Sequence, residues 1–149
     1  MDINQHTQPD KLERYSFIWS EARLVIAAFA LLIGGAPPIY LIAPASLFSL
    51  TQTGLTIAWL ISGVSALYLL YRWYNNQMKV FGGNDTKDTI AFAVMVVSGL
   101  NLGLVSIIGK NIGMSILSGR AVFFVAGVIY LAVAYYLYNR WKSRGEKLF

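Results

Sequence analysis

Charged side chains are absent from long parts of this chain. Residues 24–71 contain no Lys, Arg, Asp, Glu or His, and two further uncharged apolar stretches follow at residues 89–109 and 121–138. A helix needs about 20 residues to cross a hydrocarbon core of about 30 Å, so the first region holds two crossings, at residues 24–42 and 54–71. Unbroken apolar runs lack the alternation of barrel strands, and lipid tolerates no unpaired backbone groups. The pattern therefore predicts an all-α integral membrane protein with four transmembrane helices.

Composition supports a single membrane domain over residues 1–149. Hydrophobic residues make up 56% of the chain and charged residues only 13%, whereas a soluble helical bundle alternates polar and apolar faces. The absence of Cys excludes disulfides, thiolate metal sites and cysteine catalysis. The first 23 residues mix acidic and basic groups, unlike the short basic leader of a cleaved signal peptide, so we expect the first apolar run to be retained as a span.

Basic residues gather beside alternate ends of the predicted spans. If the N-terminus is cytoplasmic, only Lys110 and Arg120 of the 12 basic residues fall on the opposite side. The cytoplasmic set is Lys11, Arg14, Arg23, Arg72, Lys79, Lys87, Arg140, Lys142, Arg144 and Lys147. The positive-inside bias therefore predicts an N-in, C-in topology in the cytoplasmic (inner) membrane, with residues 139–149 as a basic cytoplasmic tail. This topology explains the net charge of +5 without a nucleic-acid partner. The residues expected to anchor the spans at the inner interface are Trp19, Arg72, Trp73, Arg140 and Trp141.

The polar N-terminal segment precedes the first span. We expect a flexible tail over residues 1–9 and an amphipathic helix over residues 10–23, because Pro9 and Asp10 form a helix-start pattern. The apolar stripe of this helix consists of Leu12, Tyr15, Trp19 and Ala22. The helix is expected to lie on the inner leaflet or to continue directly into the first span. The alternative is a solvated extension that docks on a partner.

The first span contains residues that break helices. These residues are Gly34, Gly35, Pro37, Pro38 and, further on, Pro44. Proline removes a backbone donor and restricts the residue before it, so the helix is expected to kink or end near Ala36. The break is either a transport-site feature or an ordinary kink followed by a hydrophobic outer loop.

Small residues mark the predicted helix contacts. They are Gly99 and Gly103 in the third span, Gly109 and Gly113 beyond its outer end, and Ala58, Ser62 and Ala66 in the second span. Glycines four residues apart let another backbone approach closely in lipid. These faces pack the second span on the third within one chain, or they assemble a homo-oligomer or a complex with another membrane subunit.

Asn101 is the only amide side chain well inside a predicted span. A polar group at that depth needs a hydrogen-bond partner, and the possible partners are Ser62, Ser65, Ser98 and Tyr130. Asn101 is therefore interpreted as a structural clasp or as a contact for a solute or ion.

Reactive groups are missing from the predicted spans. The only histidine, His6, lies in the N-terminal tail, and no buried carboxylate is expected. We therefore predict no catalytic, cofactor-binding or metal site, and no cofactor, because haem ligation, proton coupling and catalysis all require such groups.

Two functions remain. The first is a non-enzymatic integral membrane subunit or scaffold that assembles through small-residue helix faces. The alternative is a homo-oligomeric channel or uncharged-solute transporter, with a path near Asn101, Ser62 and the break over residues 34–38. The partners expected are the lipid bilayer and either further copies of this chain or another membrane subunit.

Overall fold

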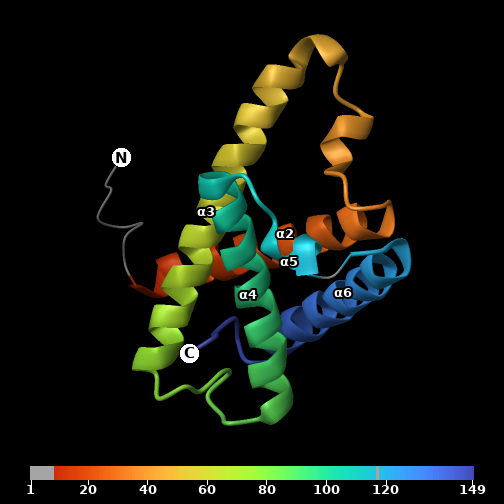
Figure 1. Cartoon of the computed structure of the whole chain (residues 1–149). Helices are drawn as coiled ribbons and strands as arrows, with labels where there is room; N and C mark the ends of the chain where they lie inside the picture. Colours follow the sequence, from red (N-terminus) through yellow and green to blue (C-terminus); the bar gives the residue numbers. More distant parts are fainter. Residues whose placement is uncertain (1–8, 117) are drawn as a thin grey trace.

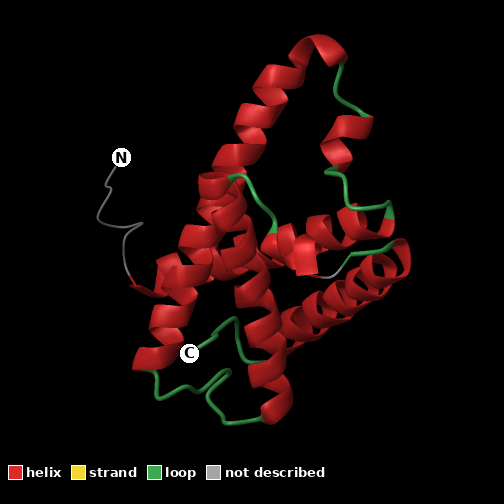
Figure 2. Ribbon diagram, viewed as in Figure 1, coloured by secondary structure: helices red, strands yellow, loops and turns green. Residues whose placement is uncertain are grey.

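The computed structural model describes residues 9–116 and 118–149, which are all-helical and contain no strand (Figure 2). The long helices are α2 (Pro9–Leu32), α3 (Phe48–Asn75), α4 (Thr86–Ile108) and α6 (Arg120–Ser143). Each of them is long and apolar enough to cross a membrane. The shorter elements are the 3₁₀ turns η1 (Pro38–Leu41) and η2 (Ala45–Leu47) and the helix α5 (Ile112–Ile116). The predicted all-α class with four spans is confirmed. The flexible tail predicted for residues 1–9 lies outside the described residues except for Pro9, where α2 begins.

The long helices form two pairs. α3 packs mainly on α4 and α2 mainly on α6, and the two pairs cross each other (Figure 1). The first pair meets backbone to backbone, because a Cβ built on Gly63 would lie 2.6 Å from the Cα of Gly103. A Cβ built on Gly99 would lie 2.8 Å from the Cβ of Ala66. Small residues thus set the separation of α3 and α4.

α2 joins the predicted amphipathic segment and the first span into one unbroken helix. Phe17 and Leu24 fill the core from this helix. All members of the predicted apolar stripe are exposed: Leu12, Tyr15, Trp19 and Ala22. Three charged side chains of the segment, Glu13, Glu21 and Arg23, are buried.

The first span begins and ends earlier in the chain than predicted, because α2 begins at Pro9 and the helix-breaking residues follow its last residue. α2 stops at Leu32 rather than at residue 42, and Gly34 and Gly35 follow with φ values of +107° and +93°. Side chains rarely adopt such angles, so glycine is favoured at both positions. The chain then makes the two 3₁₀ turns, and α3 begins at Phe48 rather than at residue 54.

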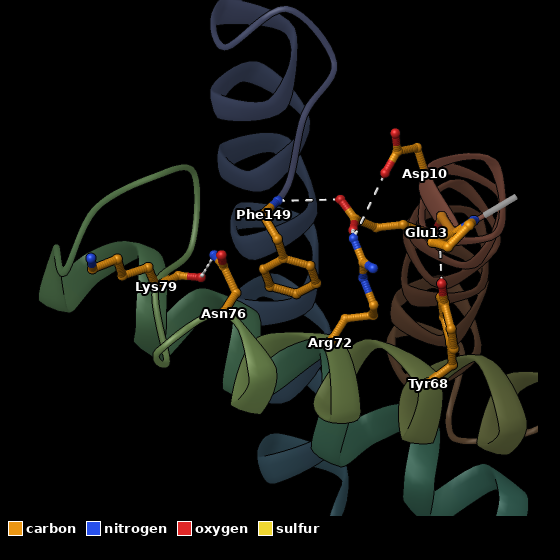
Figure 3. A network of polar contacts seen from close by, with 8 residues as sticks. Asp10, Glu13, Tyr68, Arg72, Asn76, Lys79 and Phe149 are labelled. Carbon is orange, nitrogen blue, oxygen red and sulfur yellow. Dashed lines mark hydrogen bonds and ion pairs between the residues drawn. The ribbon is translucent and has the colours of Figure 1, made fainter.

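The start of α2, the C-terminus and the α3–α4 connection lie at one end of the molecule, here called the terminal end (Figure 1). Figure 3 shows part of its polar network: Arg72 pairs with Glu13 at 2.7 Å, and Glu13 also accepts from the amide of Phe149 at 3.2 Å. The amide of Phe81 donates to Leu148 O at 2.6 Å, and Leu148 is buried. The predicted tail over residues 139–149 therefore first continues α6 and then folds back onto the bundle. The opposite end, with the α2–α3 and α4–α6 connections, is here called the loop end.

Candidate functional site

A cavity of about 860 Å³ lies between α2, α3, α4, α5, α6 and the α2–α3 connection. Most of its lining is apolar. The polar side chains in the lining are Trp19, Arg23, Trp59, Ser62, Ser98, Asn101, Asn111 and Tyr130. Ile26 and Leu41 line it as well and are exposed, so the cavity is continuous with the surface of the protein. A mainly apolar cavity with a few converging polar groups is typical of a small-molecule site.

Arg23 brings a charge into this cavity. Its residue is only 6% exposed, Nη1 donates to Ser98 Oγ at 2.8 Å, and Nη2 donates to Met95 O at 2.8 Å. Its Nε has no hydrogen-bond partner. Ser98 lies near the middle of α4, so Arg23 sits inside the bundle. α2 begins at Pro9, about four turns before the expected start of the span, so Arg23 lies within the helix bundle and not at its end.

Gly99 makes room for the guanidinium. A Cβ at this position would lie 3.3 Å from Arg23 Nη2 and 3.2 Å from Ser62 O, in addition to its clash with Ala66. The glycine that brings α3 close to α4 therefore also admits Arg23 from α2.

Trp19 and Ser62 form the neighbouring part of the wall. The indole Nε1 of Trp19 donates to Ser62 Oγ at 3.0 Å, and the hydroxyl of Ser62 donates in turn to Ala58 O at 2.7 Å. Both tryptophan and serine thus have their polar atoms satisfied at the cavity. Trp19, which was predicted as an interface anchor, lines the cavity instead of lying only on the lipid face.

Asn101 holds α5 over the cavity. Its Nδ2 donates to Asn111 Oδ1 at 2.8 Å, and its Oδ1 accepts from the amide of Gly113 at 3.1 Å. Asn111 Oδ1 also accepts from the amide of Met114 at 3.0 Å. Asn101 therefore holds the connection at the loop end. The hydrogen bonds of its side chain go to Asn111 and Gly113 and not to the serine and tyrosine side chains that were expected. Gly109 ends α4 in the left-handed conformation at φ +69°.

The helix-breaking residues form part of the cavity rim. Gly35, Pro37 and Pro38 line it, and a Cβ on Gly35 would lie 2.4 Å from Met114 Cε. Gly34 and Pro44 do not line it. The structure thus brings Ala58, Ser62 and Asn101 together with most of the predicted break.

The other predicted interface anchors gather at the terminal end, away from the cavity. Arg72 pairs with Glu13, and Arg140 donates from Nε to Asp88 Oδ1 at 2.8 Å. Trp141 is buried, with its ring 5.2 Å from that of Phe17. The ring of Trp73 packs 5.9 Å from that of Phe92. These side chains fasten helices to one another within the protein.

The expectation that no carboxylate is buried is wrong. Glu13, Glu21 and Asp88 are all buried: the first two because α2 begins well before the uncharged stretch, and Asp88 in the first turn of α4. Glu13, Phe17, Ser20 and Leu24 recur every three or four residues, which is the spacing of one helix face. That spacing was the signal available in the sequence for an inward polar face of α2.

Four long apolar helices with a cavity that opens to the surface have the architecture of a multi-pass membrane protein. In the parts of the chain that the structure describes, no three His, Cys, Asp or Glu side chains are close enough together to hold a metal ion. Comparisons with protein-family models, with proteins of curated function and with solved structures find no match to this chain.

Proposed function

We propose that this chain is a non-enzymatic integral membrane protein that binds a lipophilic small molecule in its cavity. The observation that carries the proposal is the cavity itself, whose volume of about 860 Å³ falls in the range of small-molecule sites, roughly 300–1,000 Å³. Exposed residues of the spanning helices also line it, which gives a molecule dissolved in the bilayer a lateral way in. We place the protein in the inner membrane with both termini cytoplasmic.

The second candidate is a channel or solute transporter, and the position of the cavity favours it. Ser62, Asn101 and Pro38, from the path expected for such a protein, all line the cavity. A transport path would also need an opening at the terminal end. Glu13, Phe17 and Arg72 close that end and line no part of the cavity, so this conformation supports binding rather than passage.

Assembly through small-residue faces, the basis of the scaffold hypothesis, receives less support. Gly63, Gly99 and Gly103 are buried between α3 and α4 of the same chain. A complex with another copy or another subunit would therefore use a different surface. We accordingly base the proposed function on the cavity.

Cavity filling tests the proposal. Native mass spectrometry of the protein released gently from its membrane should show a small molecule bound at a fixed ratio. Ala126→Trp fills the cavity from α6 and should remove it, while Val97→Trp, at an exposed position outside the lining, should keep it. A wild-type protein that carries nothing, or a filled variant that still carries the molecule, would contradict the proposal. The same spectra report copies of the chain or foreign subunits, and flux of uncharged solutes in proteoliposomes would favour the transporter.

A further inference from the structure

We propose that the cavity ligand is an amphipathic anion, with an acidic head held by Arg23 and an apolar chain along the cavity wall. This inference rests on the proposed function, because it names the chemical class of the molecule that the cavity binds. The head is a carboxylate or a phosphate, the groups whose geometry matches a guanidinium.

The first argument is that no carboxylate of the described residues contacts the buried guanidinium of Arg23. A buried charge is stable only when it is paired and hydrogen-bonded. Arg23 is more than nine-tenths buried, yet its two protein acceptors, Ser98 Oγ and Met95 O, are neutral, and its Nε donates to nothing. Within the described chain, no carboxylate oxygen lies within 4.0 Å of its nitrogens.

Glu21 is the nearest carboxylate in sequence and attracts the charge of Arg23, but the two side chains form no ion pair. Residues two apart on a helix do not share a face. Glu21 lines a separate cavity of about 460 Å³ between α2 and α6, together with Phe17 and Trp141. By contrast, Arg72 and Arg140 each contact a buried carboxylate, on Glu13 and Asp88. Arg23 therefore has donor capacity and charge left for a ligand.

The second argument is the apolar surface that leads away from Arg23. Ile26, Ala27, Ala30 and Leu31 follow it along the same helix, and all line the cavity. Leu32, the last residue of α2, is about 14 Å further along the helix axis at 1.5 Å per residue. An acidic head at Arg23 would thus place its chain along this wall toward Gly35 and the loop end. A free inorganic anion would leave the wall uncovered.

Head-group comparison on the wild-type protein tests the inference. The probes are dodecanol, dodecanoate, dodecyl phosphate and inorganic phosphate, added to the purified full chain in a neutral detergent. Trp19 and Trp59 line the cavity, so their fluorescence reports binding. We expect the two anionic amphipaths to bind at least roughly tenfold more tightly than dodecanol, because a charge-assisted hydrogen bond is worth about that factor. Inorganic phosphate should bind more weakly than dodecyl phosphate.

Substitutions locate the preference on Arg23. Arg23→Gln should bring the affinities of dodecanoate and dodecyl phosphate to that of dodecanol, and Arg23→Lys should keep part of the difference. Arg120→Gln removes an exposed cation at the loop end and should leave the preference intact. If Arg23→Gln does not fold, the wild-type probe series alone decides.

Three results would overturn the inference, and each has a different consequence. Equal binding of dodecanol and the anions by the wild-type protein would overturn the anion site and leave a lipophilic cavity. Inorganic phosphate as tight as dodecyl phosphate would overturn the amphipath and assign the site to a free anion. Binding of no probe at all would overturn this inference together with the proposed function.

Discussion

At the scale of single residues, the charges inside this protein are held in two ways. Asp88, which is 1% exposed, accepts from Arg140 Nε at 2.8 Å and from the hydroxyl of Tyr136 at 2.7 Å. It also lies in the first turn of α4, where the helix dipole favours a negative charge. Arg23 has only neutral protein partners. The Asp88–Arg140 pair stabilises the fold, whereas the lack of a carboxylate partner for Arg23 among the described residues supports the proposed anionic ligand.

Removing the charge of Asp88 should destabilise the fold. Asp88→Asn leaves Arg140 without its counter-ion, and we expect a loss of roughly 1.5–3 kcal/mol, the value of hydrogen bonds to charged groups. The matched control is Asp85→Asn, three residues earlier, because Asp85 caps α4 by accepting from the amide of Lys87 at 2.7 Å and Asn caps equally well. Unfolding in one detergent would compare them. Equal stability of the two variants would refute a structural role for the Asp88–Arg140 pair.

At the scale of elements, the contact of α3 with α4 depends on missing side chains. The Cα atoms of Gly63 and Gly103 are so close that a Cβ on Gly103 would lie 2.7 Å from Gly63 Cα. The clash would be with backbone, which no side-chain rotation relieves. The two helices must therefore separate to accept any larger residue.

Adding a single methyl group at this crossing should lower the stability of the protein. Gly103→Ala is expected to lower stability by about 1–3 kcal/mol, the range for overpacking a well-packed contact. Gly54→Ala, in α3 but with open space around its added Cβ, should be neutral or more stable by up to about 1 kcal/mol, because alanine favours helix. Thermal unfolding in matched micelles measures both. A Gly103→Ala protein as stable as wild type would show that the helices tolerate separation.

At the scale of the whole molecule, basic residues concentrate at the terminal end. Of the cytoplasmic set expected from the sequence, only Arg23 moves into the bundle. Lys110 and Arg120 flank the α4–α6 connection at the loop end. The charge asymmetry that predicts the topology therefore persists in the folded protein.

Cysteine labelling tests the topology directly, since the chain has no Cys of its own. Asn84→Cys places an exposed thiol in the α3–α4 connection, and Lys110→Cys places one at the loop end. In intact cells a membrane-impermeant maleimide should label the Lys110 variant only, and after permeabilisation it should label both. Labelling of the Asn84 variant in intact cells would reverse the predicted orientation.

Local signals in the sequence specify the spanning helices and the end of the first one. Uncharged runs of sufficient length specify helices in lipid, and Gly34 to Pro38 end the first of them. The small residues at Gly99 and Gly103 were also evident as a contact face. These features are local, so they can be recognised without knowing what surrounds each helix.

Which faces of the helices turn inward, and therefore where the cavity lies, depends on the tertiary packing. In water, apolar residues point to the core, but in a bilayer both lipid and core are apolar, so an apolar stripe does not reveal its direction. Leu12 and Tyr15 of the α2 stripe are exposed, Trp19 and Ala22 line the cavity, and Glu13, Glu21 and Arg23 are buried. Arg23 reaches the middle of α4 because Gly99 leaves space there, a contact between residues far apart in the chain. The cavity and its one unpaired cation arise from that packing.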